Sequence, residues 1–300
     1  MNTFWSDYVQ SPEELYQSRS LRFREDNREE WLRVLGVREG METLEIGCGP
    51  GLLCHRLKSW LPSLMVTGVD RDSRHLAFAR QKAAEQGLDC TFWEGDATSL
   101  PFENNRFGLC FSHTVMEHVE PRVFLREQYR VLRPGGRIVI LSVRPNLSLN
   151  TEGWRPSGEE EESLCRKAWT AAENFQKTLP PVCAYPISEE AFGPLLTECG
   201  FQAVNLRFLI DTHVPDNADT PPKRAMEAFE EERFSALSSL EKALRMAPGG
   251  LTLAEENRLR ELINRRFDSR IAAYRRGEKR WEVSYRVTLA VTGEKGEDRS

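Results

Sequence analysis

The sequence predicts an α/β fold with a doubly wound, mostly parallel sheet. Short apolar runs that are typical of buried strands occur at 43–46, 64–69, 90–93, 107–111 and 137–143. Helical patterns lie between several of them, at 51–60, 74–86 and 121–132. Strands that alternate with helices in this way form a parallel sheet with helices on both faces. Such sheets bind ligands beyond the carboxyl ends of the strands, where the winding reverses, so we expect a functional site there.

Changes in composition and periodicity divide the chain into parts. Residues 1–39 are expected to form an N-terminal helical cap, in which Ser11, Pro12 and Glu14 are typical of a capped helix start. The other parts are a core at 40–146, a cover segment at 147–187, the rest of the core sheet at 188–211 and 281–292, and a helical insertion at 212–280. The cover segment is too long for an ordinary connection, which favours a position over a site. With the two late strands the predicted sheet has seven strands.

The insertion at 212–280 is expected to be a helical hairpin. Apolar residues recur at helical spacing at 226–244 and at 259–274, and Pro248, Gly249 and Gly250 separate the two patterns. The second helix carries a cationic run: Arg265, Arg266, Arg270, Arg275, Arg276, Lys279 and Arg280. Such a run near a helix C-terminus is typical of a solvated face. The alternatives are a clamp on an acidic substrate and a homodimer through the insertion, since each apolar stripe must be buried.

The overall composition limits the classes of partner. The 300 residues carry 41 Lys and Arg against 46 Asp and Glu, a formal net charge of -5, which argues against sequence-independent binding to nucleic acid or acidic membranes. No run approaches the roughly 20 apolar residues of a membrane span, and the first ten residues lack the basic flank and apolar run of a signal peptide. We therefore expect a cytoplasmic protein. The seven cysteines form no Cys-x-x-Cys pair, and no metal site is predicted.

The sharpest local motif is Gly47-Cys48-Gly49-Pro50-Gly51, which follows a predicted buried strand and precedes a helix. Glycines permit positive φ and let a ligand approach the free backbone amides. The spacing Gly-x-Gly-x-Gly differs from the dinucleotide fingerprint Gly-x-Gly-x-x-Gly, so pyrophosphate is not the favoured ligand. A nicotinamide-dependent oxidoreductase is disfavoured for the same reason. An ordinary tight turn is the structural alternative.

Two aspartates after later strands extend this pattern. Asp70 ends the second predicted strand, where nucleotide-binding α/β folds place a carboxylate that accepts hydrogen bonds from both ribose hydroxyls. Asp72 lies nearer the following helix and is better suited to cap it. Asp96 and Ala97 follow the third strand, where a carboxylate and a backbone amide could read the edge of adenine.

In order and spacing, these motifs resemble the class I S-adenosylmethionine-dependent methyltransferases. The similarity is to the small-molecule branch, methyltransferase type 11, which includes the ubiquinone and menaquinone methyltransferases. It extends from Gly40 to about Val143, and the runs at 96–102, 112–119 and 130–136 contribute to it. The resemblance implies a Rossmann-like methyltransferase fold with strand order 3-2-1-4-5-7-6. It also implies S-adenosylmethionine as the cofactor and S-adenosylhomocysteine as its product.

The resemblance further implies a set of cofactor-binding residues. These are Gly47, Cys48 and Gly49 along the methionine part, with Gly51 completing the turn; Glu45 for the ammonium group; Ser112 and His113 facing the methionine moiety; Asp70 on the ribose; Arg71 beside the adenine; and Asp96 and Ala97 at its edge. Tyr16 would close over the site, and a position in the core is its alternative.

The chemistry of methyl transfer makes modest demands on the protein. The sulfonium charge is neutralised as the nucleophile attacks, so proximity and alignment supply much of the rate. A base is needed only where the acceptor must lose a proton, and His118 is the local candidate because an unperturbed histidine titrates close to neutrality. A structural role for His118 is the alternative, and Glu117 is expected to be a solvated neighbour.

The predicted function is methyl transfer to O, N, S or C of a small molecule. The alternatives are an S-adenosylmethionine-binding regulator without turnover and a methyltransferase that acts on a macromolecule. Residues 111–114 lack the Asn/Asp-Pro-Pro-Tyr motif of amino-directed DNA and RNA methyltransferases, and no paired-glutamate loop of protein arginine methyltransferases is present. Nucleic acid is therefore not expected as a partner.

Overall fold

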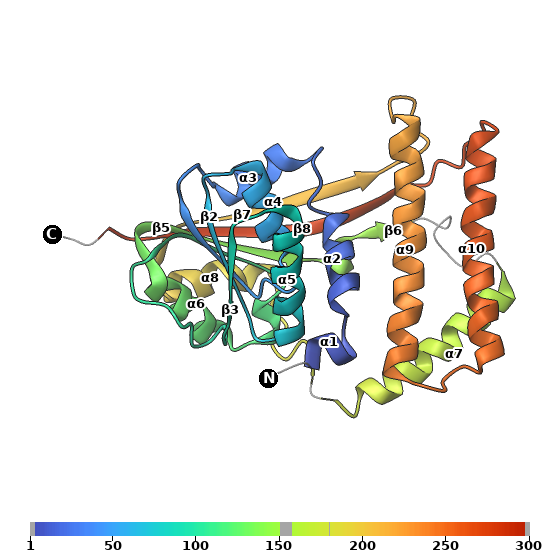
Figure 1. The fold of residues 1–300 in the computed structure, drawn as a ribbon, viewed down its shortest axis with the longest axis horizontal. Helices are drawn as coiled ribbons and strands as arrows, with labels where there is room; N and C mark the ends of the chain where they lie inside the picture. Colours follow the sequence, from blue (N-terminus) through green and yellow to red (C-terminus); the bar gives the residue numbers. More distant parts are fainter. Residues whose placement is uncertain (1–3, 151–157, 180, 298–300) are drawn as a thin grey trace. The chain divides into compact units, whose positions relative to one another are not determined.

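The computed structural model describes residues 4–150, 158–179 and 181–297 (Figure 1). Residues 1–3 of the predicted cap, and 151–157 and 180 of the predicted cover segment, lie outside the described residues. The chain divides into two compact units. Apart from those undescribed residues, the first combines Met1–Arg144, Val182–Leu209 and Val287–Ser300, and the second combines Pro145–Pro181 and Ile210–Arg286. The division predicted from the sequence is finer than this one and stays a prediction.

The first unit is built on the doubly wound sheet that the sequence predicts. Its strands are β1 (Glu42–Ile46), β2 (Met65–Asp70), β3 (Cys90–Glu94), β4 (Phe107–His113) and β5 (Leu132–Val143), with most of β7 (Phe201–His213) and of β8 (Ser284–Lys295). Residues 210–213 of β7 and 284–286 of β8 belong to the second unit. They follow the order β3-β2-β1-β4-β5-β8, and β7 pairs with β8. The pairs from β3 to β5 are parallel, and β8 is antiparallel to β5. The predicted fold class and strand order are confirmed, with β8 as the seventh core strand.

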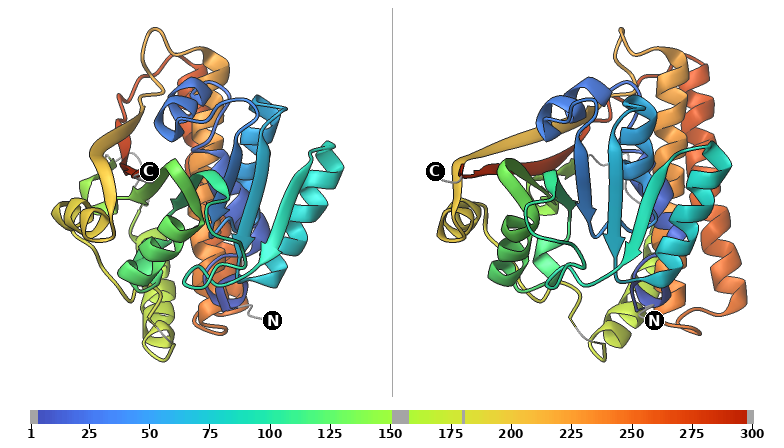
Figure 2. Two further views of the ribbon diagram at one scale, coloured as in Figure 1. Left: turned by 90° about the vertical axis from the view of Figure 1, so that its left-hand side faces the viewer. Right: turned by 60° about the vertical axis from the view of Figure 1, so that its left-hand side comes forward.

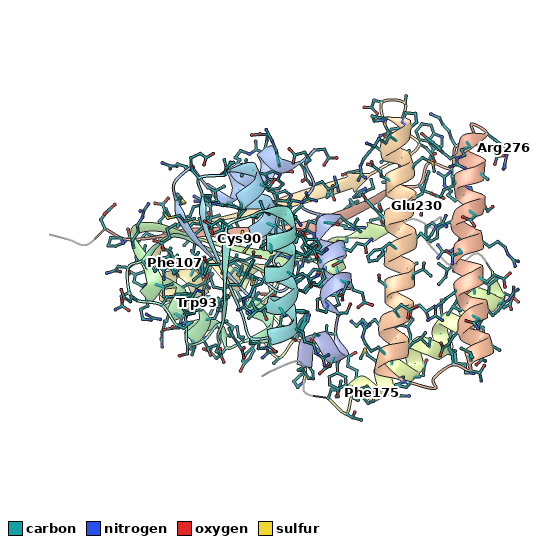
Figure 3. All side chains as sticks on the ribbon, viewed as in Figure 1. Cys90, Trp93, Phe107, Phe175, Glu230 and Arg276 are labelled. Atoms are coloured by element: carbon teal, nitrogen blue, oxygen red, sulfur yellow. The ribbon has the colours of Figure 1, made fainter. Side chains whose placement is uncertain are left out.

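Helices cover both faces of this sheet (Figure 2). On one face α3 (Arg28–Leu35), α4 (Leu52–Trp60) and α5 (Ser73–Gln86) share a hydrophobic core with Leu109 and Val139. On the other face α6 (Pro121–Val131) and α8 (Phe192–Glu198), which follows the short η4 (Glu189–Ala191), pack against Phe107 and Ile138. Figure 3 labels Cys90 at the border of the first core and Phe107 within the second. The winding reverses between β1 and β4, because the chain passes from β1 to β2 on one side and later returns to β4 on the other.

Two short helices precede α3, namely α1 (Phe4–Tyr8) and α2 (Pro12–Ser20). The predicted capping box at the start of α2 is confirmed: Ser11 Oγ accepts the Glu14 N–H, and the Glu14 carboxylate accepts the Ser11 N–H at 2.9 Å. Asp72 caps α5, as predicted, but it is buried, since its carboxylate also accepts the backbone N–H of Ser6 in α1 at 2.9 Å. This bond ties α1 to the edge of the sheet where β2 ends.

The second unit is a bundle of three helices, with a short η2 (Pro145–Leu147) and a two-residue β6 (Leu149–Asn150) that pairs with the start of β8. Within it α9 (Pro222–Met246) and α10 (Leu253–Arg275) lie side by side, and α7 (Glu159–Gln176) packs across both (Figure 1). Figure 3 labels Phe175 near the end of α7, where it borders their shared core. The apolar stripes of α9 and α10 are buried within this unit, so they do not require a second copy, and the predicted homodimer stays a prediction. None of the helices in the described residues combines the length and apolar character that a membrane crossing requires.

The cationic run of α10 is not a solvated face throughout, which corrects the expectation from the sequence. Arg270 is 4% exposed, and it donates from Nη2 to Asp216 at 2.6 Å and from Nε to Glu282 at 2.8 Å. Arg266 donates to Glu161, which is 1% exposed, at 3.0 Å. Charged groups enter a protein interior when an opposite charge satisfies them, and each of these arginines has such a partner. The other five members of the run are exposed, as predicted.

Candidate functional site

A cavity of about 360 Å³ lies in the first unit, at the carboxyl ends of β1, β2, β3 and β4. This is the predicted edge of the sheet, next to the point where the winding reverses. Eight predicted site residues line it: Gly47, Gly49, Asp70, Arg71, Asp96, Ala97, His113 and His118. No cluster of His, Cys, Asp and Glu suited to a metal ion occurs among the described residues.

The glycine turn after β1 forms one wall of this cavity. Gly47 and Gly49 have φ values of +67° and +55°, and the N–H groups of Gly47 and Cys48 both donate to the carbonyl of Val69. A Cβ at Gly47 would lie 2.4 Å from Val115 Cγ2. Glycine is therefore required at residue 47 for two reasons: its backbone is in the left-handed region, and Val115 packs too close to leave space for a Cβ.

Asp70, at the end of β2, is held by backbone donors. Its Oδ2 accepts the N–H of Gly49 and its Oδ1 accepts the N–H of Asp72, each at 2.8 Å. Each carboxylate oxygen has a second lone pair, so both remain able to accept another hydrogen bond. The two bonds fix the orientation of a carboxylate whose pKa is raised by burial. A fixed pair of acceptors suits the two adjacent hydroxyls of a ribose, the role that the resemblance implies.

Asp96 and Ala97 line the cavity directly after β3. The Asp96 Oδ1 atom accepts the N–H of Thr98 at 2.7 Å and its hydroxyl at 2.6 Å. The other oxygen, Oδ2, makes no hydrogen bond to the described part of the chain. A carboxylate held through one oxygen can offer the second to an exocyclic amino group, as the adenine-edge prediction requires.

A recess of about 20 Å³ continues behind the glycine turn and is lined by Glu45 and Cys48, two further predicted residues. Glu45 is 4% exposed and accepts a hydrogen bond from the Cys54 thiol at 3.0 Å. Burial raises the pKa of the Glu45 carboxyl to about 7, although the Cys54 bond and the charge of Arg19 act in the opposite direction. Glu45 is therefore balanced between its neutral and charged forms near neutral pH.

His113, the last residue of β4, contacts two arginines of the N-terminal segment. Its Nε2 atom lies 3.0 Å from Arg19 Nη1 and 2.6 Å from Arg22 Nη1. A guanidinium can only donate, so Nε2 must accept, and the ring is neutral with its proton on Nδ1. The lone pair of His113 is thus already used, and His113 is not free to take a proton from a substrate.

His118 has the opposite arrangement. It belongs to the short helix η1 (Met116–His118), and its Nδ1 atom is hydrogen-bonded to the carbonyl oxygen of Val182. A carbonyl can only accept, so Nδ1 carries the proton and Nε2 keeps its lone pair. The ring of Trp5 packs edge-on against His118, with centroids 4.8 Å apart. Of the two histidines predicted at the site, His118 alone has a nitrogen available as a base.

Tyr16 lines neither the cavity nor its recess and instead packs against the hydrophobic core, the alternative position given for it. Its hydroxyl lies 3.3 Å from His55 Nδ1 and accepts from Gln86 at 3.1 Å, and its ring packs against Phe78. The reason is the helical period. Leu15 and Arg19 are four residues apart on α2 and both line the cavity, whereas Tyr16 is turned by about 100° from Leu15.

Two other predicted residues also lie outside the cavity wall. A Cβ at Gly51 would come within 2.9 Å of Ala79 Cβ and Phe92 Cζ, so this glycine permits close packing of α4 against α5 and β3. Ser112 is fully buried in the middle of the sheet, paired with Ile46 of β1 and Ile140 of β5. Neither position borders the cavity or its recess.

Glu117 is not the solvated neighbour that the sequence suggests. One carboxylate oxygen accepts the hydroxyl of Ser142 on β5, and the other, Oε2, is buried without a hydrogen bond among the described residues. The backbone carbonyl of Glu117 also accepts the N–H of Tyr185 at 3.0 Å. Glu117 therefore belongs to the interior beside the cavity.

Several lining residues were not predicted. The most informative are Trp5, Leu15, Arg19, Thr114, Val115 and Tyr185. Arg19 had a usable signal, because a capped helix at 12–20 places it on the face of Leu15. Trp5 and Tyr185 had none, since they are brought together only by tertiary packing around η1.

Residues 44–140 match the protein family described as a methyltransferase domain. Residues 44–140 therefore carry a methyltransferase domain. The ubiquinone/menaquinone biosynthesis C-methyltransferase UbiE of Bdellovibrio bacteriovorus is 34% identical over 115 residues, which cover 38% of this chain and 49% of the relative. A fatty-acid O-methyltransferase of Mycolicibacterium smegmatis is 36% identical over 37% of this chain and 40% of that relative. The chain thus spans half or less of the length of these curated relatives.

This match confirms the predicted methyltransferase family over residues 44–140. Among solved structures, the phosphoethanolamine N-methyltransferase 2 of Haemonchus contortus in complex with S-adenosyl-L-methionine superposes with a TM-score of 0.54 at 18% identity. That superposition covers 98% of this chain and 60% of the other. The YcgJ protein of Bacillus subtilis superposes with a TM-score of 0.51 at 16% identity, covering 91% of this chain and 100% of the other. At these identities the similarity shows the fold alone.

Proposed function

We propose that this chain transfers a methyl group from S-adenosylmethionine to O, N, S or C of a small-molecule acceptor. The observation that carries the proposal is the cavity at the carboxyl ends of β1 to β4, in which the glycine turn, Asp70, Asp96 and His118 meet. When bound, S-adenosylmethionine supplies an activated methyl group whose transfer depends above all on alignment.

The residues present fit this cofactor. Glycine at residue 47 lets Val115 pack directly against the turn, and the backbone of Gly47 and Gly49 forms part of the cavity wall. Asp70 offers two oriented acceptors to a ribose, and Asp96 offers one oxygen to an adenine amino group. Glu45 provides a carboxylate for an ammonium group in the recess behind the turn.

We assign His118 as the base for an acceptor that must lose a proton. Because its Nδ1 donates to Val182, the ring is held in one tautomer and orientation, with Nε2 ready to accept. His118 lines the cavity together with Trp5 and Tyr185, so an acceptor in that part of the cavity would lie against the ring. The ring of Trp5 packs against one side of the imidazole.

A substitution at His118 tests this role. We expect His118→Asn, which keeps a donor for the Val182 carbonyl, to lower kcat by roughly 10²–10⁴-fold at neutral pH. The affinity for S-adenosylhomocysteine should stay within about twofold of the original. An unchanged kcat would exclude His118 as the base.

The raised pKa of Glu45 makes cofactor binding depend on pH. The free protein holds Glu45 protonated below about pH 7, against an ordinary value of 4.5, and a neighbouring ammonium group favours the carboxylate. We therefore expect affinity for S-adenosylhomocysteine to rise as the pH increases through about 7, with a proton released on binding below that value. Titration calorimetry in two buffers of different ionisation enthalpy at pH 6 measures this release. In Glu45→Gln the affinity should be weaker and independent of pH between 6 and 8, and equal slopes in both proteins would contradict the assignment.

Two measurements test the function as a whole. Calorimetry should show binding of both S-adenosylmethionine and S-adenosylhomocysteine. Methyl-tritiated S-adenosylmethionine should then label at least one member of an acceptor panel that contains phenols, carboxylic acids, amines and thiols. Binding without label in any acceptor would favour a regulator without turnover, and label retained in protein or RNA of a cell extract would favour a macromolecular substrate. Absence of binding to both nucleosides would overturn the proposal.

A further inference from the structure

Arg19, which was not among the predicted site residues, places a cation at the recess end of the cavity. It lines both the main cavity and the recess behind the glycine turn. Its Nη1 donates to His113 Nε2 at 3.0 Å and its Nη2 donates to Thr114 Oγ1 at 2.8 Å. A guanidinium has five N–H donors, so three remain after these two bonds.

The charges around the recess are arranged for a zwitterion. Arg19 and Glu45 both border it, beside the backbone of Gly47 and Gly49. Burial lowers the pKa of the Arg19 guanidinium to about 10, and the nearby charge of Glu45 acts in the opposite direction. Arg19 therefore stays charged at neutral pH. An α-amino acid carries one cation and one anion on the same carbon. A recess with a carboxylate and a guanidinium is complementary to both.

We propose that Arg19 binds the α-carboxylate of the methionine part of S-adenosylmethionine, while Glu45 faces its ammonium group. This inference rests on the proposed function and extends it to a residue outside the matched segment 44–140. The contacts to His113 and Thr114 fix the plane of the guanidinium, and a fixed fork suits a carboxylate, which it can bind through two parallel hydrogen bonds. The helix α2 thereby completes the cofactor site.

The competing explanation is structural. Arg19 could serve only to fasten α2 to the end of β4 through His113 and Thr114. The two explanations differ in what they predict for a ligand without an amino-acid end. A fastening role affects every ligand of the cavity alike, whereas a carboxylate contact affects only ligands that carry the carboxylate.

The test compares two ligands in calorimetry with the intact chain. S-adenosylhomocysteine has the amino-acid end, and 5′-methylthioadenosine is the same nucleoside thioether without it. We expect Arg19→Gln to weaken S-adenosylhomocysteine binding by about tenfold to hundredfold and to leave 5′-methylthioadenosine binding within about twofold. Arg19→Lys keeps the charge but loses the fork, so it should recover part of the lost affinity.

Arg22→Gln is the matched control, because Arg22 contacts the same His113 atom but lines neither cavity. It should leave the ratio of the two affinities unchanged. An equal loss for both ligands in Arg19→Gln, or no loss for either, would overturn the inference while leaving the methyltransferase proposal intact. If the unmodified protein binds neither ligand, the proposed function itself fails, and the inference fails with it.

Discussion

Gly47→Ala should lower the affinity for S-adenosylmethionine and S-adenosylhomocysteine by at least about hundredfold, which corresponds to about 2.8 kcal/mol. The residue has φ of +67°, and its new Cβ would lie 2.4 Å from Val115 Cγ2. To relieve that contact, either Val115 must move into the cavity or the turn must shift. A shift of the turn would also move Gly49, whose N–H holds the Asp70 carboxylate. Calorimetry with S-adenosylhomocysteine measures the loss.

Gly40→Ala provides the control, because Gly40 also has a positive φ but an added Cβ there would contact no other residue. Gly40 has φ of +73°, and a Cβ there would meet nothing within 4 Å. It should cost about 1 kcal/mol of stability, as an L-residue in the left-handed region does, and leave cofactor affinity unchanged. Val115→Ala combined with Gly47→Ala should restore part of the affinity, since the two methyl groups nearest the new Cβ are gone. Wild-type affinity in Gly47→Ala alone would show that the turn does not contact the cofactor.

The parts of the site that could be predicted from the sequence are those fixed by local geometry. The glycine turn, Asp70 and Asp96 each follow a strand directly, so recognising the strands places all three at one edge of the sheet. Their partners in the structure are mostly backbone groups at the ends of the same adjacent strands, as in the bonds from Gly49 and Asp72 to Asp70. Such contacts depend on spacing that the sequence displays.

The parts that could not be predicted depend on packing between distant segments. Arg19 meets Thr114 over a separation of 95 residues, and His118 is held by Val182 over 64. The N-terminal helix suggested Tyr16 as a residue that closes over the site, and only the rotation of α2 shows that Arg19 faces the cavity instead. The prediction of a solvated face on α10 failed at Arg266 and Arg270 for the same reason. Arg270 is buried because Asp216, 54 residues away, provides its counter-charge.

The pairing of Arg270 leads to the second large effect, which is on stability. Asp216 Oδ2 accepts Arg270 Nη2 at 2.6 Å and the N–H groups of Arg280 and Trp281 at 2.9 Å. We expect Asp216→Ala to lower the free energy of unfolding by about 3–5 kcal/mol, because it leaves a buried guanidinium with Glu282 as its remaining counter-charge. Urea unfolding followed by circular dichroism measures the loss.

Glu162→Ala is the matched control, since Glu162 pairs with Arg166 at 2.7 Å with both side chains more than half exposed. Exposed pairs contribute about 0–1 kcal/mol, so the two acidic-to-alanine changes should differ by at least about 2 kcal/mol.

Hydrogen exchange adds a local readout of the same substitution. Trp281 has φ of +53° and is held there by its bond to Asp216, so the amides of residues 280 and 281 should lose protection in Asp216→Ala.

Burial opposes ionisation of Asp216, but the bonds from Arg270 and the backbone hold the pKa of its carboxyl below the ordinary value of 3.8. Its contribution is therefore present at neutral pH and is lost as the pH falls below that value, so Asp216→Ala and the unmodified protein should converge in stability in acid. Equal stability at pH 7 would show that Arg270 is satisfied by Glu282 alone.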